Sequence, residues 1–222
     1  MSRKSNPVSQ FSLAALMLAL LLPAGARAGI VYLVTVDTSA IRNTAGFLDF
    51  DFAPGSTPQS QAAFVQIGSF SPAGGLSGAP QVSGGGSGTL PAVVSLDNST
   101  SFNDYFQGFN YGDAIAFSLS FGGPAIDSPN GTATFGSKFG FGMFDSNGDA
   151  LLTSDPNVTF TVDVNPDGTT SLTSFSPNAQ AALASSVPEP EAPALLALAL
   201  VGFLTARRGC PAQRPVRCQV NP

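Results

Sequence analysis

Two short segments place side-chain oxygens at alternate positions, the spacing that calcium-binding loops use. Their oxygen-bearing residues are Asp145, Asn147 and Asp149 in the first segment, and Asp163, Asn165 and Asp167 in the second. Neither segment carries the bidentate Glu of such loops, because Pro156 and Ser174 stand at the corresponding positions. Backbone carbonyls could still complete a Ca²⁺ site. Asp and Asn are also the usual residues of hairpin turns, so a calcium site and a plain turn both remain open.

An aromatic cluster surrounds Asp104. It suggests a platform for sugar rings, and its candidate glycan-binding residues are Tyr105, Phe106 and Tyr111. Sugar platforms favour Trp and Tyr, whereas this chain has no Trp and only three Tyr. Aromatic side chains are also readily buried, so packing in a core is the alternative interpretation.

The groups that usually carry acid–base and nucleophilic catalysis are missing. The chain has no His, which is the commonest general base and metal ligand. Asp49 and Asp51 could serve a glycosidase as paired carboxylates, but two acids at alternate positions also fit the solvated face of a strand. The sequence therefore predicts a protein that is not an enzyme and has no cofactor, apart from the calcium considered above.

The charge is concentrated and acidic. Between residues 29 and 187 the chain has twelve acidic residues and two basic ones, Arg42 and Lys138, so the formal charge there is about −10. Phosphate backbones are bound by clustered Lys and Arg. Nucleic acid is therefore excluded as a partner.

The N-terminus has the parts of a secretory signal peptide. Arg3 and Lys4 precede an apolar run from Phe11 to Leu22, and the small residues Ala26 and Ala28 follow. This order is typical of a leader that the secretion machinery recognises and signal peptidase removes. We expect cleavage after Ala28, with residues 1–28 as the signal peptide.

The C-terminus combines a proline-rich motif, a short apolar segment and a basic stop. The motif consists of Val187, Pro188, Glu189 and Pro190, and Arg207 and Arg208 follow the apolar segment. A helix from residue 192 to 206 would reach only ~22 Å, less than the ~30 Å of a bilayer core. The Arg pair favours a cytoplasmic location for the far end.

This tripartite ending resembles the PEP-CTERM sorting signal of Gram-negative surface proteins. The resemblance implies recognition by exosortase, transient residence in the inner membrane, and delivery to the cell surface or extracellular matrix. Such proteins usually come from organisms that make exopolysaccharide and biofilm or floc. Here the chain continues as a fourteen-residue tail, 209–222, which contains Cys210 and Cys218 and departs from the family pattern.

Alternating apolar residues predict short strands between the two end signals. The expected strands cover 30–36, 46–52, 62–70, 113–121, 135–143, 157–164 and 169–175. Within 62–70, the alternation places Phe64 and Phe70 on one face and Val65 and Ile67 on the other. Residues 72–91 are rich in Gly and Ser and fit either a loop or a weakly paired strand, and residues 178–184 are a weak helix candidate.

These observations predict an all-β fold, an antiparallel β-sandwich of about eight to ten strands that is jelly-roll-like. The sandwich is expected at 29–175, flanked by an N-terminal signal helix and a C-terminal transmembrane helix. A linker at 176–191, a transmembrane helix with its Arg stop at 192–208 and a short cytoplasmic tail at 209–222 follow. The expected function is a structural or adhesive, non-catalytic role in envelope, biofilm or floc. The alternative is a carbohydrate- or calcium-binding module that engages exopolysaccharide.

Overall fold

The structure is a computed structural model that describes residues 29–57 and 59–184, here called the body. Twelve strands, one 3-10 helix and one short α-helix make up the body. In chain order these elements are β1 (Ile30–Asp37), η1 (Ser39–Ile41), β2 (Ala45–Pro54), β3 (Phe64–Pro72), β4 (Gly75–Ser83), β5 (Gly86–Gly88), β6 (Val94–Asp97), β7 (Asp104–Asn110), β8 (Ala114–Gly122), α2 (Pro124–Asp127), β9 (Ser137–Asp145), β10 (Phe160–Val164), β11 (Thr170–Ser174) and β12 (Ala179–Leu183).

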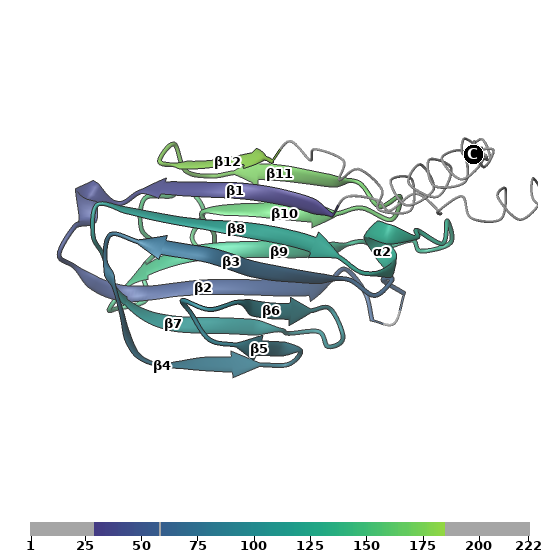
Figure 1. Cartoon of the computed structure of the whole chain (residues 1–222), viewed down its shortest axis with the longest axis horizontal. Coiled ribbons are helices and arrows are strands. Elements are labelled where there is room, and N and C mark those ends of the chain that lie inside the picture. The colour runs from purple at the N-terminus through teal and green to yellow at the C-terminus, as the bar shows by residue number, and fades with distance from the viewer. Residues whose placement is uncertain (1–28, 58, 185–222) are drawn as a thin grey trace, which may run out of the picture. The chain divides into compact units, whose positions relative to one another are not determined.

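The strands form two six-stranded antiparallel sheets. Sheet A has the order β12-β1-β8-β3-β6-β5, and sheet B has the order β11-β10-β9-β2-β7-β4. Figure 1 shows the strands of sheet A and those of sheet B lying roughly along the same direction. The expected all-β class is confirmed. The expected signal helix and transmembrane helix lie outside the described residues, and within the body no helix is long and apolar enough to cross a membrane.

Period-two alternation gives each sheet an inner and an outer face. In β2, Leu48, Phe50 and Phe52 are fully buried between the sheets, while Asp49 and Asp51 point to the outer face. In β8 the same alternation buries the four apolar residues Ile115, Phe117, Leu119 and Phe121. The inner faces therefore meet as one apolar core.

Aromatic rings fill the centre of that core. Phe50 of sheet B lies against Phe117 of sheet A and against Phe141 of its own sheet, with ring centroids 5.5 and 5.0 Å apart. Phe117 and Phe141 also contact each other at 5.1 Å. This triangle joins the two sheets without a covalent link, since both cysteines of the chain lie beyond the body.

A bulge in β3 corrects the expected faces of that strand. The register against β8 shifts between Gly68 and Ser71, and Ser69 takes a φ of 51°. The shift turns Phe70 into the core, whereas Phe64 stays 36% exposed. Val65 and Ile67 are fully buried, so the prediction that Phe64 and Phe70 share a face was wrong. A bulge adds one residue to a strand and reverses the faces beyond it.

The number of strands exceeds the expected eight to ten. β4 and β5 lie in the Gly/Ser-rich stretch, which pairs through backbone groups and needs no apolar alternation. β12 lies in the segment expected to be linker, so the folded body extends past the expected boundary at residue 175. The Ala-rich residues 179–183 form this strand and not a helix, because they pair with β1 from Tyr32 to Val36.

Truncation of Phe50 tests the aromatic core. Phe50→Ala should lower the free energy of unfolding by about 3–5 kcal/mol, because it leaves a cavity between the two sheets. Phe102→Ala is the matched control, since Phe102 is 62% exposed, and it should change stability by less than about 0.5 kcal/mol. Denaturant unfolding followed by tyrosine fluorescence measures both. Equal losses in the two variants would contradict the assigned core.

Candidate functional site

Three carboxylates meet on the outer face of sheet B. Alternation in β2 sends Asp49 and Asp51 outward, and the register between β2 and β7 places Asp51 directly opposite Asp104. Asp49 pairs with Phe106 one step further along β7. We call Asp49, Asp51 and Asp104 the carboxylate trio. Like charges directly opposite each other destabilise a strand pair, so this arrangement calls for an explanation.

The trio is partly buried, and its carboxylates have few partners among the described residues. Asp104 is only 9% exposed. Asp104 lies diagonally across from Asp49, two residues along β7 from Phe106, so a hydrogen bond between the two carboxyls requires a proton on one of them. The Oδ1 atom of Asp49 is buried without a hydrogen-bond partner in the described part of the chain.

Burial and mutual repulsion change the acidity of the trio. Burial, the hydrogen bond to Asp104 and the charges of Asp104 and Asp51 together raise the pKa of Asp49 to about 8. Burial and the charge of Asp104 raise the pKa of Asp51 to about 6, although the charge of Lys138 opposes this rise. At neutral pH we therefore expect Asp49 to be largely protonated and Asp51 to be largely ionised.

Apolar groups and glycines surround the trio. The rings of Phe47 and Phe106 stack at 4.7 Å on neighbouring positions of β2 and β7. On β9, a side chain at Gly140 would overlap the Asp51 carboxylate, so glycine gives that carboxylate its space. A Cβ at Gly142 would lie 2.7 Å from the Asn157 carbonyl, which covers this part of the sheet. These contacts account for the burial of the acids.

A hollow of about 460 Å³ opens at the end of the same sheet. Its wall includes the ion pair between Lys138 Nζ and Asp163 Oδ1, 2.9 Å apart, on neighbouring strands β9 and β10. Asn165 and Ser171 add amide and hydroxyl groups to the wall. We call this feature the end hollow.

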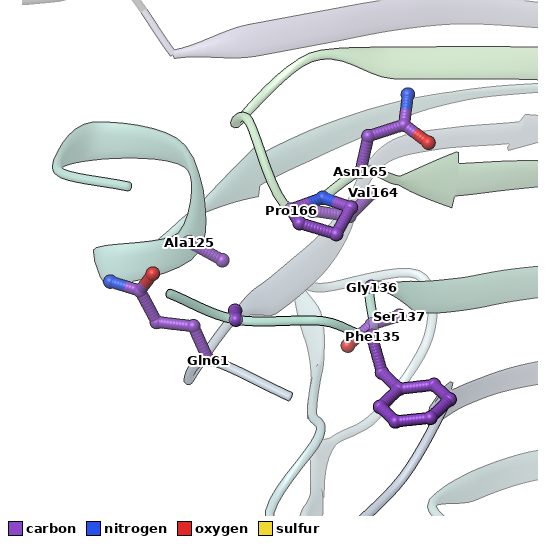
Figure 2. Close-up of a pocket in the computed structure, with 9 residues that line it drawn as sticks. Gln61, Ala125, Phe135, Gly136, Ser137, Val164, Asn165 and Pro166 are labelled. Carbon is purple, nitrogen blue, oxygen red and sulfur yellow. The ribbon is translucent and has the colours of Figure 1, made fainter. Parts of the chain in front are cut away.

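A smaller pocket adjoins the end hollow and shares part of its wall. Its volume of about 10 Å³ is room for a single water. Figure 2 shows Asn165 and Pro166 on one side of this pocket and Gln61 on another, with the ring of Phe135 turned away from both. Phe135 is 46% exposed, so it offers an aromatic surface beside the polar groups.

The first calcium candidate is a turn after β9 that uses its own carboxylate. The Oδ1 of Asp145 accepts hydrogen bonds from the backbone N–H groups of Asn147, at 2.8 Å, and Asp149, at 2.9 Å. The Asn147 side chain donates to Oδ2 of the same carboxylate. These bonds hold the pKa of Asp145 below its usual value. The carboxylate thus closes its own turn.

The residues of the second calcium candidate bind different partners and do not point to a common centre. Asp163 pairs with Lys138 on the outer face of sheet B, whereas Asp167 accepts two bonds from Thr169 in the β10–β11 hairpin. Asn165 donates to the Thr169 hydroxyl, and Gly168 takes a φ of 81° at this turn. Within residues 29–57 and 59–184, no three His, Cys, Asp or Glu side chains gather in a metal-holding arrangement.

The three glycan candidates lie on different faces. Tyr105 is fully buried, and its hydroxyl accepts a bond from the Leu90 N–H and donates to Gln107. Tyr111 is 2% exposed and donates to the Phe47 carbonyl at 2.7 Å. Phe106 follows Tyr105 on β7 and therefore points to the opposite, outer face. In this conformation the three rings do not form a shared exposed platform.

The remaining predicted residues lie outside the described part of the chain. They are the cleavage residues Ala26 and Ala28 and the sorting residues Val187, Pro188, Glu189, Pro190, Arg207 and Arg208. Both stay predictions.

The sequence did not point to Asp104 as a partner of Asp49 and Asp51. The paired acids were visible as a local pattern, but Asp104 stands more than fifty positions away and becomes a neighbour only through the β2–β7 register. No local signal could have found this contact.

Comparison of the chain with known proteins gave no match. No protein-family model matches it, and no match was found among curated proteins or solved structures. The geometry described above is therefore the basis for any assignment of function to the body.

Removal of the Lys138 charge tests the electrostatics of the outer face. Lys138→Met should raise the pKa of Asp51 above about 6, because the cation that favours its ionised form is gone. Carboxyl-carbon NMR measures the titration, and Asp51→Asn assigns the resonance. Arg42→Met removes the other cation of the body, which pairs with Asp113 at 3.0 Å, and should leave Asp51 unchanged. An equal Asp51 pKa in the wild type and Lys138→Met would contradict this account.

Proposed function

We propose that this chain is an exported, exosortase-sorted protein of the cell surface or extracellular matrix, with a structural or adhesive role and no catalysis. The observation that carries the proposal is the agreement between the fold boundaries and the two end signals. β1 begins at Ile30, two residues after the expected cleavage at Ala28. β12 ends at Leu183, four residues before Val187 of the sorting motif.

Processing at both ends would leave the body whole. β1 and β12 pair with each other, and the N–H of Ala184 donates to the carbonyl of Val31. The described core runs from Tyr32 to Val164, so both expected cuts fall outside it. A sorted protein needs such a body, because it must remain folded after its membrane segment is gone.

The pairing of the first eight strands supports the finer assignment of a jelly-roll-like sandwich. β1 pairs with β8, β2 with β7, and β3 with β6, while β4 and β5 lie next to each other at the far edge. These nested antiparallel pairs are what results when one long hairpin rolls into two sheets. β9 to β12 then extend both sheets at the opposite edge.

Replacement of the sorting motif tests the proposal in the native host. Changing Pro188, Glu189 and Pro190 to Ala should keep the full C-terminus on the chain and abolish its release to the surface. Mass spectrometry of the protein's C-terminal peptides in membrane and surface fractions measures both effects. Glu191→Ala, one residue beyond the motif, is the matched control and should be processed as the wild type.

Two outcomes would contradict the proposal. A surface form of the wild type that still carries Cys218 and Pro222 would exclude processing at the motif. Unchanged matrix, floc and adhesion after deletion of the gene would exclude the structural role.

The end hollow favours a second candidate function, a module that engages exopolysaccharide. Polar groups of four kinds line it: an ammonium, a carboxylate, an amide and a hydroxyl, from Lys138, Asp163, Asn165 and Ser171. Sugar rings offer hydroxyls to such groups and a C–H face to an aromatic ring, and exposed Phe135 belongs to the small pocket that adjoins the end hollow. The role proposed here for the end hollow replaces the platform expected at Tyr105, Phe106 and Tyr111.

A single aromatic substitution tests this second function. Phe135→Ala should weaken retention on a glycan array by about tenfold, which corresponds to the loss of about 1.4 kcal/mol of ring contact. Phe102→Ala removes an exposed ring outside both the end hollow and its adjoining pocket, and this variant should bind as the wild type. Absence of specific retention by the wild type, with and without calcium, would rule the function out.

A further inference from the structure

The outer face of sheet B holds more negative charge than it can neutralise. β2 contributes Asp49 and Asp51, β7 contributes Asp104, and β10 contributes Asp163. The only cation on this face within the body is Lys138 of β9, and its ammonium already pairs with Asp163 at 2.9 Å.

The positions that directly face the trio on the neighbouring strands carry no charge. Gly140 and Gly142 occupy the facing positions of β9, and the neighbouring β4 faces Phe106 and Asp104 with Gln81 and Ser83. Asn157 and Val158 of the β9–β10 connection lie over the two glycines. If all three carboxyls were ionised, the trio would carry three charges with no hydrogen-bond donor of its own.

We propose that the trio is a proton-dependent clamp, in which one proton shared between Asp49 and Asp104 joins β2 to β7, and that sheet B loosens when this proton leaves in mildly alkaline solution. A carboxyl donating to a carboxylate makes a short, charge-assisted hydrogen bond. Without the proton, the same pair is a repulsion between two poorly solvated anions. The clamp lies at the centre of its sheet, because β2 pairs with both β7 and β9.

The sign of the pH dependence follows from the direction of the shifts. The pKa of Asp49 is raised from 3.8 to about 8, so the folded state holds this proton more tightly than the unfolded state. Its contribution to stability is complete below pH 3.8 and is lost as the pH rises to about 8. Asp51 behaves alike but loses its contribution between pH 3.8 and about 6.

Carboxylates outside the trio change the stability with pH in the opposite direction, and they do so at lower pH. Hydrogen bonds lower the pKa values of Asp37, Asp145 and Asp167 below 3.8, so their contributions are lost as the pH falls below that value. Among the groups with shifted pKa values, Asp49 is therefore the one whose titration changes the stability between pH 6 and 8. This separation makes the clamp measurable.

The experiment compares the full chain in mild detergent with Asp49→Asn, between pH 5 and 9. Tyrosine fluorescence reports on the body alone, because all three tyrosines are buried there and the chain has no Trp. For the wild type, the unfolding constant should rise by up to about tenfold per pH unit between pH 6 and 8. Asparagine resembles the protonated acid in shape and can still donate to Asp104, so this rise should disappear in Asp49→Asn.

Asp149→Asn is the matched control. Asp149 is exposed in the turn after β9, and its side chain makes no hydrogen bond within the described residues. This variant loses one negative charge, as Asp49→Asn does, and should keep the wild-type slope. If Asp49→Asn does not fold, Asp104→Asn removes the same shared proton from the other strand and is read in the same way.

Three results would overturn the clamp. Equal slopes for the wild type and Asp49→Asn between pH 6 and 8 would show that no proton is held there. An Asp49 carboxyl carbon that titrates near pH 4 in the wild type would show the same directly. Stabilisation of the wild type at pH 8 by 1 mM CaCl₂, lost in Asp49→Asn, would assign the trio to a metal ion and not to a proton. These outcomes are independent of sorting and localisation.

Discussion

Contact between aromatic rings of the two sheets is the interaction on which the rest of this structure depends. The body has no cysteine and only two cations, so neither disulfides nor ion pairs can hold the sheets together. Burial of Phe50, Phe117 and Phe141 between the sheets supplies what those bonds would supply elsewhere. Because close-packed rings tolerate little displacement, the core also fixes the register of the strands that carry them. Every outward-facing group takes its place from that register.

The carboxylate trio is a consequence of this constraint. A strand that presents Leu48, Phe50 and Phe52 to the core must present the residues between them to the opposite face. Asp49 and Asp51 therefore point outward, where ordinary solvation would leave them ionised. The register with β7 places Asp104 beside them. Gly140 leaves room for the Asp51 carboxylate, while Phe106 and the chain over Gly142 limit the access of water. The altered acidity of these residues thus depends on the packing of the core on the other side of the same strand.

Local alternation predicted much of the fold, because the faces of β1, β2 and β8 depend on residues within one strand. This prediction failed where a β-bulge or pairing with a distant strand sets the direction of a side chain or the type of element. The bulge at Ser69 reversed the face of Phe70, and no residue type in the segment announces a positive φ at a serine. β12 became a strand because β1 offered it an edge, against the weak helical preference of its alanines. The candidate site was the least predictable part, since Asp104 meets Asp51 through a pairing that no sequence pattern encodes.

The acids that close turns and the acids of the carboxylate trio differ in the partners of their oxygens and in their pKa values. The carboxylates of Asp145 and Asp167 accept bonds from backbone groups of their own turns, so their oxygens serve the local conformation and their pKa values fall. The trio has no such donors, and the pKa values of Asp49 and Asp51 rise. The presence of an acid in a turn is accounted for by the hydrogen bonds with which it stabilises the turn. A buried acid without a hydrogen-bond donor lowers the stability of the fold when it is ionised. Replacement of such an acid by a neutral residue would remove that cost, so its presence in β2 and β7 points to a use for the charge or for the proton that cancels it.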